Sequence, residues 1–146
     1  MARIIFCCAL AAGTLVLAGC GDDVTTTVAS GTVRTDSGTP CDGALVVFHP
    51  QESERINDPK PVATCDDQGK FTLTTFQKDD GAEPGKYGVT VVWQAKVKAG
   101  RLSLSSESEP VGKDQLKGKY GKPASPLLTA EVTAGSPNTF EFIVEK

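Results

Sequence analysis

Short apolar or alternating segments separated by turn-forming residues dominate most of the chain. Residues 44–49 (ALVVFH) form an almost continuous apolar run that ends at Pro50, and residues 70–75 (KFTLTT) alternate so that Phe71 and Leu73 share one face. Continuous runs of this length are typical of buried strands, and strict alternation is typical of strands with one face in solvent. The pattern therefore predicts strands rather than helices.

The same reasoning predicts seven strands, at residues 27–34, 44–49, 62–65, 70–75, 89–93, 127–132 and 139–144. Residues 66–69 are expected to close a hairpin between the third and fourth strands, with Gly69 at positive φ, and residues 133–138 to close a last hairpin. Alternation along residues 139–144 places one face of the final strand inward. Short strands at this spacing favour an all-β fold, a seven-stranded Greek-key β-sandwich.

The N-terminal segment predicts export and lipidation. Arg3 precedes thirteen uncharged residues, Ile4–Val16, a run too short for a span of about 20 residues but suited to a secretory signal. Leu17–Cys20 reads LAGC, which matches the bacterial lipobox. We expect a cleaved signal helix over residues 1–19, leaving Cys20 with diacylglycerol on its thiol and an acyl chain such as palmitate on its amine. The alternative is an ordinary signal peptide, or a buried helix with an incidental cysteine.

A short tether and one domain are expected after the cleavage site. Residues 20–27 are small and polar, and residues 28–146 suffice for a single domain. Two or more lipid chains would anchor this domain stably to a membrane. Gly21 stands where an Asp would favour inner-membrane retention in diderm lipoproteins, so the outer membrane is favoured. The expected location is the cell envelope, periplasmic or surface-facing.

Charge is unevenly distributed along the chain. The net charge of -3 offers no general positive field and argues against nucleic-acid binding. Residues 94–125, however, carry seven basic side chains against three acidic ones, and loops beyond ~12–15 residues are usually functional or disordered. Three interpretations remain open: a solvated loop, a basic arm that contacts an anionic envelope polymer or lipid headgroups, and a contact with a neighbouring protein.

Cysteine usage suggests one disulfide. Cys7 and Cys8 would leave with the signal and Cys20 would be lipidated, so that Cys41 and Cys65 remain. An even remainder in an exported chain favours a bridge, because oxidising compartments let thiols pair. The alternative is two independent buried thiols.

Motifs spread over most of residues 28–145 carry a family resemblance. They are Gly31-Thr32-Val33, Gly43-Ala44, Asp66 with Gly69-Lys70-Phe71, Gly85-Lys86-Tyr87, Tyr120 with Pro123, and Ser125-Pro126-Leu127. In these motifs the chain resembles small lipoproteins of planctomycete-type bacteria with a carboxypeptidase-regulatory-like, transthyretin-like β-sandwich. The resemblance implies that Asp66 and Gly69 shape a turn and that the Tyr87 hydroxyl bonds to backbone in a tyrosine corner. It implies no activity, because this fold carries many functions.

The sequence contains no recognisable catalytic or metal-binding motif. The single histidine, His49, has no nucleophile or acid in a recognisable pattern. The pairs Asp66–Asp67 and Asp79–Asp80 offer oxygen atoms for Ca²⁺ but lack EF-hand spacing, and Asp is common in turns for its backbone bonds. We therefore expect no enzyme, no metal and no cofactor.

The function predicted from these observations is that of a non-catalytic, lipid-anchored module of the cell envelope, structural or interacting with a partner. The alternative is a surface lipoprotein that binds carbohydrate or peptide through Trp93, Tyr120 and the basic segment. Packing in the core or at its rim is the competing role for Trp93. A compact apolar cleft with convergent polar groups would favour the binding protein.

Overall fold

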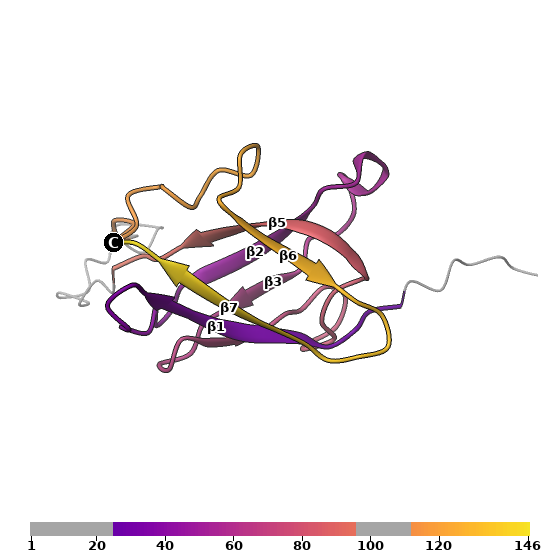
Figure 1. Cartoon of the computed structure of the whole chain (residues 1–146), viewed down its shortest axis with the longest axis horizontal. Helices are drawn as coiled ribbons and strands as arrows, with labels where there is room; N and C mark the ends of the chain where they lie inside the picture. The colour runs from indigo at the N-terminus through magenta and orange to yellow at the C-terminus, as the bar shows by residue number, and fades with distance from the viewer. Residues whose placement is uncertain (1–24, 96–111) are drawn as a thin grey trace, which may run out of the picture.

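The computed structural model describes residues 25–95 and 112–146. Within them, two sheets pack face to face (Figure 1). One sheet has the order β4 (Lys70–Thr72), β1 (Ala29–Thr35), β7 (Asn138–Val144), and the other has the order β3 (Val62–Thr64), β2 (Leu45–Pro50), β5 (Gly85–Val92), β6 (Leu128–Val132). The predicted all-β, two-sheet architecture is confirmed. The predicted signal segment, Cys20 and part of the long basic loop lie outside the described residues.

Helical structure in the described part is limited to one 3-10 turn, η1 (Ser53–Arg55). Among these residues no helix has the length and apolar character needed to cross a bilayer. The sheets therefore supply the whole framework that positions the loops discussed below.

Strands β1 and β7 run parallel, with Ala29 opposite Asn138 and Thr35 opposite Val144. All other strand pairs are antiparallel. Because β1 and β7 share a direction, the first described residues lie at one end of the sandwich and the C-terminus at the other (Figure 1). The seven residues of β1 separate these ends by about 20 Å at ~3.3 Å per residue.

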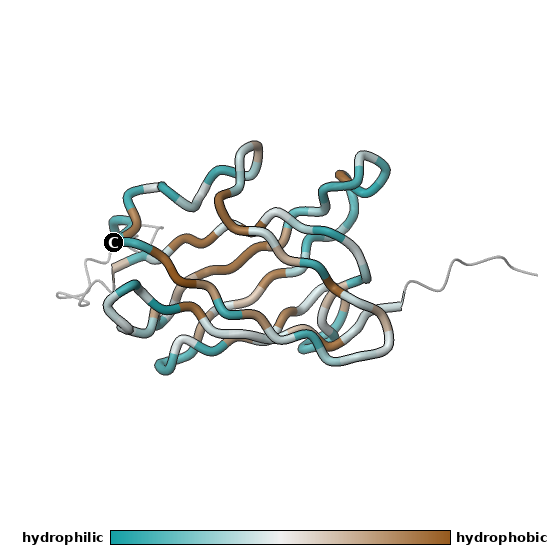
Figure 2. The backbone as a smooth tube through the Cα atoms, in the orientation of Figure 1, coloured by the Kyte–Doolittle hydropathy of each residue, from teal (hydrophilic) through white to brown (hydrophobic). Residues whose placement is uncertain are grey.

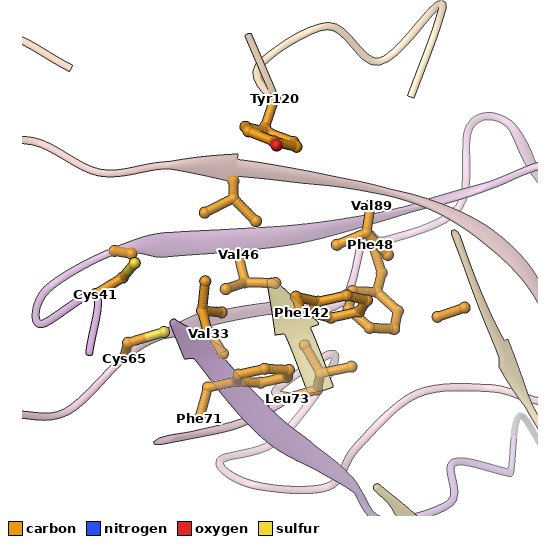
Figure 3. Close-up of a cluster of buried hydrophobic side chains, with 14 of the residues drawn as sticks. Val33, Cys41, Val46, Phe48, Cys65, Phe71, Leu73, Val89, Tyr120 and Phe142 are labelled. Atoms are coloured by element: carbon orange, nitrogen blue, oxygen red, sulfur yellow. The ribbon is translucent and has the colours of Figure 1, made fainter. Parts of the chain in front are cut away.

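The core lies between the sheets and is lined by alternate residues of the strands. Figure 2 shows that hydrophobic residues are concentrated in the strands. Phe48 of β2 is fully buried, and its ring centroid lies 5.5 Å from that of Phe140 and 6.1 Å from that of Phe142. Phe71 of β4 stacks on Phe142 of β7, with the two ring centroids 6.1 Å apart (Figure 3). Aromatic pairs at such distances contribute about 0.5–1.5 kcal/mol each beyond area burial. The predicted inward face of the last strand is thus observed.

Each predicted hairpin joins strands that belong to different sheets. The first hairpin closes locally, because Val62 and Thr74 exchange two backbone hydrogen bonds and Asp66 donates its N–H to the carbonyl oxygen of Lys70. The turn at residues 66–69 forms as expected, with Gly69 at φ 73°. Local turn chemistry fixes the reversal of the chain, whereas burial of Ala63 and the strand partners beyond the turn decide which sheet each strand joins.

Strand β5 begins at Gly85, four residues before the predicted start at residue 89. Gly85 and Gly88 weaken the strand signal in the sequence, since glycine is unfavourable inside strands. In the structure, a Cβ atom on Gly88 would collide with the ring of Pro126. Close approach of the 123–126 loop therefore explains a glycine within a central strand.

Candidate functional site

Tyr87 lies at the start of β5 with its side chain fully buried. Its hydroxyl donates a hydrogen bond of 2.7 Å to the carbonyl oxygen of Glu83, which is a backbone bond of the kind that the resemblance implies. The same hydroxyl accepts a bond of 3.0 Å from Nη2 of Arg55. Burial raises the pKa of Tyr87 although the Arg55 charge opposes the rise, so the hydroxyl stays protonated and keeps donating. The arrangement is structural.

Arg55 fastens the loop of residues 51–61 to the start of β5. Its guanidinium pairs with Glu83 at 2.8 Å and with Asp58 at 3.3 Å, and it donates to the carbonyl oxygen of Pro84 at 3.0 Å. Glu52 lies 3.8 Å from Nη1 of Arg55, and its Oε2 is buried with no hydrogen bond within the described residues. We call this cluster the arginine corner: Arg55, Glu52, Asp58, Glu83 and Tyr87.

The strand pattern of the sequence does not reveal the arginine corner, because residues 51–61 lie between two predicted strands, at 44–49 and 62–65. A signal was present: Glu52, Arg55 and Asp58 are spaced three apart, as in one helical turn. The partner Glu83 is 28 positions away, so only the fold reveals that the cluster closes.

The predicted turn residues also have structural partners. Oδ1 of Asp66 accepts the backbone N–H groups of Gln68 at 2.9 Å and of Lys70 at 2.8 Å. At Gly69 any Cβ atom would collide with the carbonyl oxygen of Val33. Both residues therefore shape the turn and leave little for a ligand.

Asp80 resembles Asp66 in its bonding. Its carboxylate accepts the N–H groups of Thr75, Phe76 and Gln77 at 2.7–3.0 Å. Burial tends to raise the pKa of Asp80, but these donors outweigh burial and lower it. Across residues 25–95 and 112–146, no three His, Cys, Asp or Glu side chains gather as metal ligands would.

Cys41 and Cys65 are free thiols, so the structure does not support the disulfide predicted from the cysteine count. Both are buried, with exposed fractions of 0% and 3%, at the edge of the core beside Val33 (Figure 3). Burial raises the pKa of Cys41 to about 11 and that of Cys65 to about 12. Protonated thiols pack as small apolar side chains, and an even cysteine count carries no information about this packing.

Trp93 and Tyr120, predicted as aromatic contacts for a sugar or peptide, are each only 7% exposed. Trp93 donates from Nε1 to the carbonyl oxygen of Asp42 at 3.0 Å. The Tyr120 hydroxyl accepts the backbone N–H of Glu145 at 3.0 Å. Both rings are thus largely buried, and both residues anchor loops to the sandwich.

Before the chain enters β6, residues 113–122 lie alongside the last part of β5 and are held by the carboxylate of Asp114. Its Oδ1 accepts the N–H groups of Trp93 at 3.1 Å and Leu116 at 3.0 Å, and its Oδ2 accepts that of Gly118 at 2.7 Å. Leu116 is 2% exposed, while Lys117 has a φ of 56°, which is uncommon for a residue with a side chain. This part of the basic segment is a well-bonded turn.

The turn presents its lysines outward while Leu116 and Tyr120 point into the sandwich. We call this surface the lysine edge: Lys113, Lys117, Lys119, Lys122 and Lys146, all exposed. Lys119 pairs with Glu145, and Nζ of Lys146 bonds to Oε1 of Gln115 at 3.0 Å. The remaining three lysines form no ion pair within the described residues. The nearby carboxylate of Asp114 is already occupied by three backbone donors.

His49 lies on the outer face of the four-stranded sheet and bonds through Nε2 to Oγ1 of Thr90 at 3.0 Å. Burial and the charge of Lys60 lower its pKa, which keeps the ring neutral at pH 7. The adjoining hollow, about 390 Å³ and open to solvent, is lined by residues 49–51, Gly88 and the 123–126 loop. Its lining brings no carboxylate or nucleophile to the imidazole.

A second open hollow, about 460 Å³, lies between β3 and β4 and is lined by threonines, two lysines and two aspartates. Asp66 in its wall is committed to the turn described above. Neither hollow resembles the compact apolar cleft of a small-molecule site.

Comparisons of the chain with protein-family models, curated proteins and solved structures give no significant match. Functional inference therefore rests on the residues themselves. In the described part of the chain the predicted site residues fill structural positions, whereas three lysines of the lysine edge form no ion pair there.

Proposed function

We propose that this chain is a non-catalytic, lipid-anchored β-sandwich of the bacterial cell envelope that serves as an interaction module. The observation that carries the proposal is the lipobox Leu17–Cys20, which stands only five positions before Thr25, the first described residue of the folded domain. Five residues reach at most about 18 Å. A lipid on Cys20 would therefore hold the sandwich at the membrane surface.

We also propose that the fold is a Greek-key, transthyretin-like sandwich of the kind in carboxypeptidase-regulatory-like lipoproteins. Supporting features are the seven strands in two sheets, the Asp66 turn and the bond from the Tyr87 hydroxyl to a backbone carbonyl. Gly21 after the lipobox cysteine supports an outer-membrane location.

The chemistry of the described side chains supports a non-catalytic role. His49 bonds to a threonine rather than to a carboxylate. Asp66, Asp80 and Asp114 each accept backbone N–H groups, so their carboxylates are engaged in holding turns. The alternative, carbohydrate or peptide binding through Trp93 and Tyr120, is less well supported, because both side chains are buried.

Metabolic labelling with an alkyne-bearing fatty acid in a bacterial host tests the anchor. The wild-type protein should be labelled and recovered with membranes, and Cys20→Ser should be neither. The double variant Cys7→Ser/Cys8→Ser is a matched control, because it removes two cysteines that the expected cleavage discards, and it should keep the label. Equal labelling of Cys20→Ser and wild type, or no label on either, would defeat the proposal.

A further inference from the structure

We infer that the lysine edge binds an anionic polysaccharide of the envelope on the side of the domain that faces away from the anchoring membrane. The inference deepens the proposed function and rests on it for the orientation. It uses only the described lysines: Lys113, Lys117, Lys119, Lys122 and Lys146.

The backbone of the lysine edge is held in place by hydrogen bonds to Asp114 and to β5. Asp114 binds three backbone N–H groups, Tyr120 accepts the N–H of Val91 through its carbonyl oxygen at 3.1 Å, and Gln115 donates its N–H to the carbonyl oxygen of Trp93 at 2.7 Å. Two residues in succession, Lys117 and Gly118, adopt positive φ of 56° and 74°. A lysine at such a φ is conformationally unfavourable. A scaffold that fixes the backbone from which the lysines project lowers the ordering cost of binding.

Three of the five charges of the lysine edge form no ion pair within the described residues. Of its five ammonium groups, one pairs with Glu145 and one contacts the Gln115 amide. Lys146 also lies over the Trp93 ring, with Nζ 5.1 Å from the ring centroid. The three other lysines project into solvent from a chain whose net charge is negative. Positive charge gathered on one edge of an acidic protein attracts a polyanion.

The lysine edge lies away from the end of the sandwich at which the chain enters from Cys20. Glu145 and Lys146 follow directly after β7, whose last residue pairs with the last residue of β1. Their contacts with Lys119 and Gln115 bring the edge to the C-terminal end of the sandwich (Figure 1). That end is one strand length, about 20 Å, from the end at which the chain enters from Cys20. A lipid headgroup of the anchoring membrane is therefore a poor fit.

The chemistry of the side chains favours repeated carboxylates along a hydrated polymer. All five cations are lysines, which are flexible and strongly hydrated point charges, whereas the planar fork of arginine suits bidentate phosphate recognition. Trp93 and Tyr120, the aromatic residues nearest the edge, are buried and offer no face to stack on a base. Binding of an acidic polysaccharide requires neither the planar guanidinium of arginine nor an exposed aromatic ring.

Binding of labelled polygalacturonate to the lipidated protein in detergent tests the inference, with dextran as the neutral polymer. Lys113→Gln/Lys117→Gln/Lys122→Gln removes the three unpaired lysines, and its affinity should fall roughly tenfold. Lys60→Gln/Lys78→Gln/Lys86→Gln is the matched control, with the same charge change on exposed lysines outside the edge. Its affinity should stay within about twofold, since surface charges beyond a Debye length are largely screened.

Three outcomes would overturn the inference: no binding of polygalacturonate by the wild type, equal losses in the two triple variants, or binding to phosphatidylglycerol vesicles that depends on the edge while polygalacturonate binding does not. The alkyne label on Cys20 is read on the same preparations. Intact lipid without polymer binding rejects the lysine edge alone. Polymer binding without lipid rejects the anchor and, with it, the assigned orientation.

Discussion

The arginine corner and the lysine edge both fasten a loop to the sandwich, but they use charge differently. In the corner, Arg55 is 20% exposed and contacts three carboxylates and a tyrosine hydroxyl. At the edge, the fastening is done by Asp114, which binds backbone N–H groups, while the lysines point outward. Charge in the corner is part of the fold, whereas most of the charge at the edge faces solvent.

The two regions pair their charges differently because their side chains differ in hydration. A half-buried guanidinium loses hydration and must be paired, so it is surrounded by acceptors. An exposed ammonium keeps its hydration and gains little from a pair. If charge has these two roles, substitutions in the corner should change stability and substitutions of the exposed lysines should not.

The largest loss is expected for Arg55→Ala. The substitution leaves Glu52, Asp58 and Glu83 without their cation, and we expect about 2–3 kcal/mol, somewhat below the cost of breaking a fully buried pair. Urea denaturation of the purified protein measures it. Arg34→Ala is the control, because Arg34 pairs with Glu141 at 3.1 Å with both side chains about half exposed, and it should cost at most about 0.5 kcal/mol. Equal losses would remove the distinction between corner and surface pairs.

The next effect concerns the scaffold of the lysine edge. Asp114→Ala removes the acceptor of three backbone N–H groups, and we expect a loss of about 2 kcal/mol. Asp67→Ala, at an exposed turn position, should change the unfolding free energy by less than about 0.5 kcal/mol. A loss for Asp114→Ala as small as that for Asp67→Ala would show that the turn is not held by this carboxylate.

Removal of the Tyr87 hydroxyl in the arginine corner should cost more unfolding free energy than removal of the Tyr120 hydroxyl at the lysine edge. Tyr87→Phe removes a donor to Glu83 and an acceptor for Arg55, so we expect about 1.5 kcal/mol. Tyr120→Phe removes only an acceptor for the N–H of Glu145 near the C-terminus, and about 0.5 kcal/mol is expected. Thermal and urea unfolding of the pair give the order, and a reversed order would contradict the account of the corner.

Part of the loss of folding stability at low pH should arise from Glu52 in the arginine corner. The N–H of Lys86 and the Arg55 charge lower the pKa of Glu52 against the effect of burial. A lowered carboxyl pKa stabilises the folded state above the unfolded pKa of about 4.3, and this stability is lost as pH falls through the folded value. Glu52→Gln should therefore flatten the decline of unfolding free energy below about pH 5. An unchanged slope would mean that Glu52 is not linked to folding.

The smallest effect is expected for Lys113→Gln/Lys117→Gln/Lys122→Gln. Because these lysines have no ion pair in the described structure, their removal should shift the unfolding free energy by less than about 0.5 kcal/mol. A destabilisation comparable to that of Arg55→Ala would show that the fold needs them and would end the comparison.

Much of the strand framework was predictable from the sequence, because burial imposes the period of two seen at Phe71, Leu73 and Phe142. Gly69 was predictable from turn chemistry. The assignment of β3 and β4 to different sheets was not, because it depends on partners far along the chain. The arginine corner was missed for the same reason, since Glu83 meets Arg55 only after folding.

The errors at the candidate site have another cause. Trp93, Tyr120, Cys41 and Cys65 were judged by residue type, and residue type does not reveal which side of a strand or loop becomes buried. Each of the four lies in the core or at its margin. Lysines, by contrast, rarely lie fully buried, so the basic segment could be located from the sequence although its bonded turn could not.

The most direct test of the central claim is the mass of the mature N-terminal peptide, measured on protein extracted from bacterial membranes. The account predicts a chain that begins at Cys20 and carries a diacylglycerol thioether, with an acyl chain on its amine in hosts that add one. A chain that still begins at Met1, or a Cys20 with a free thiol in the membrane-extracted protein, would contradict it.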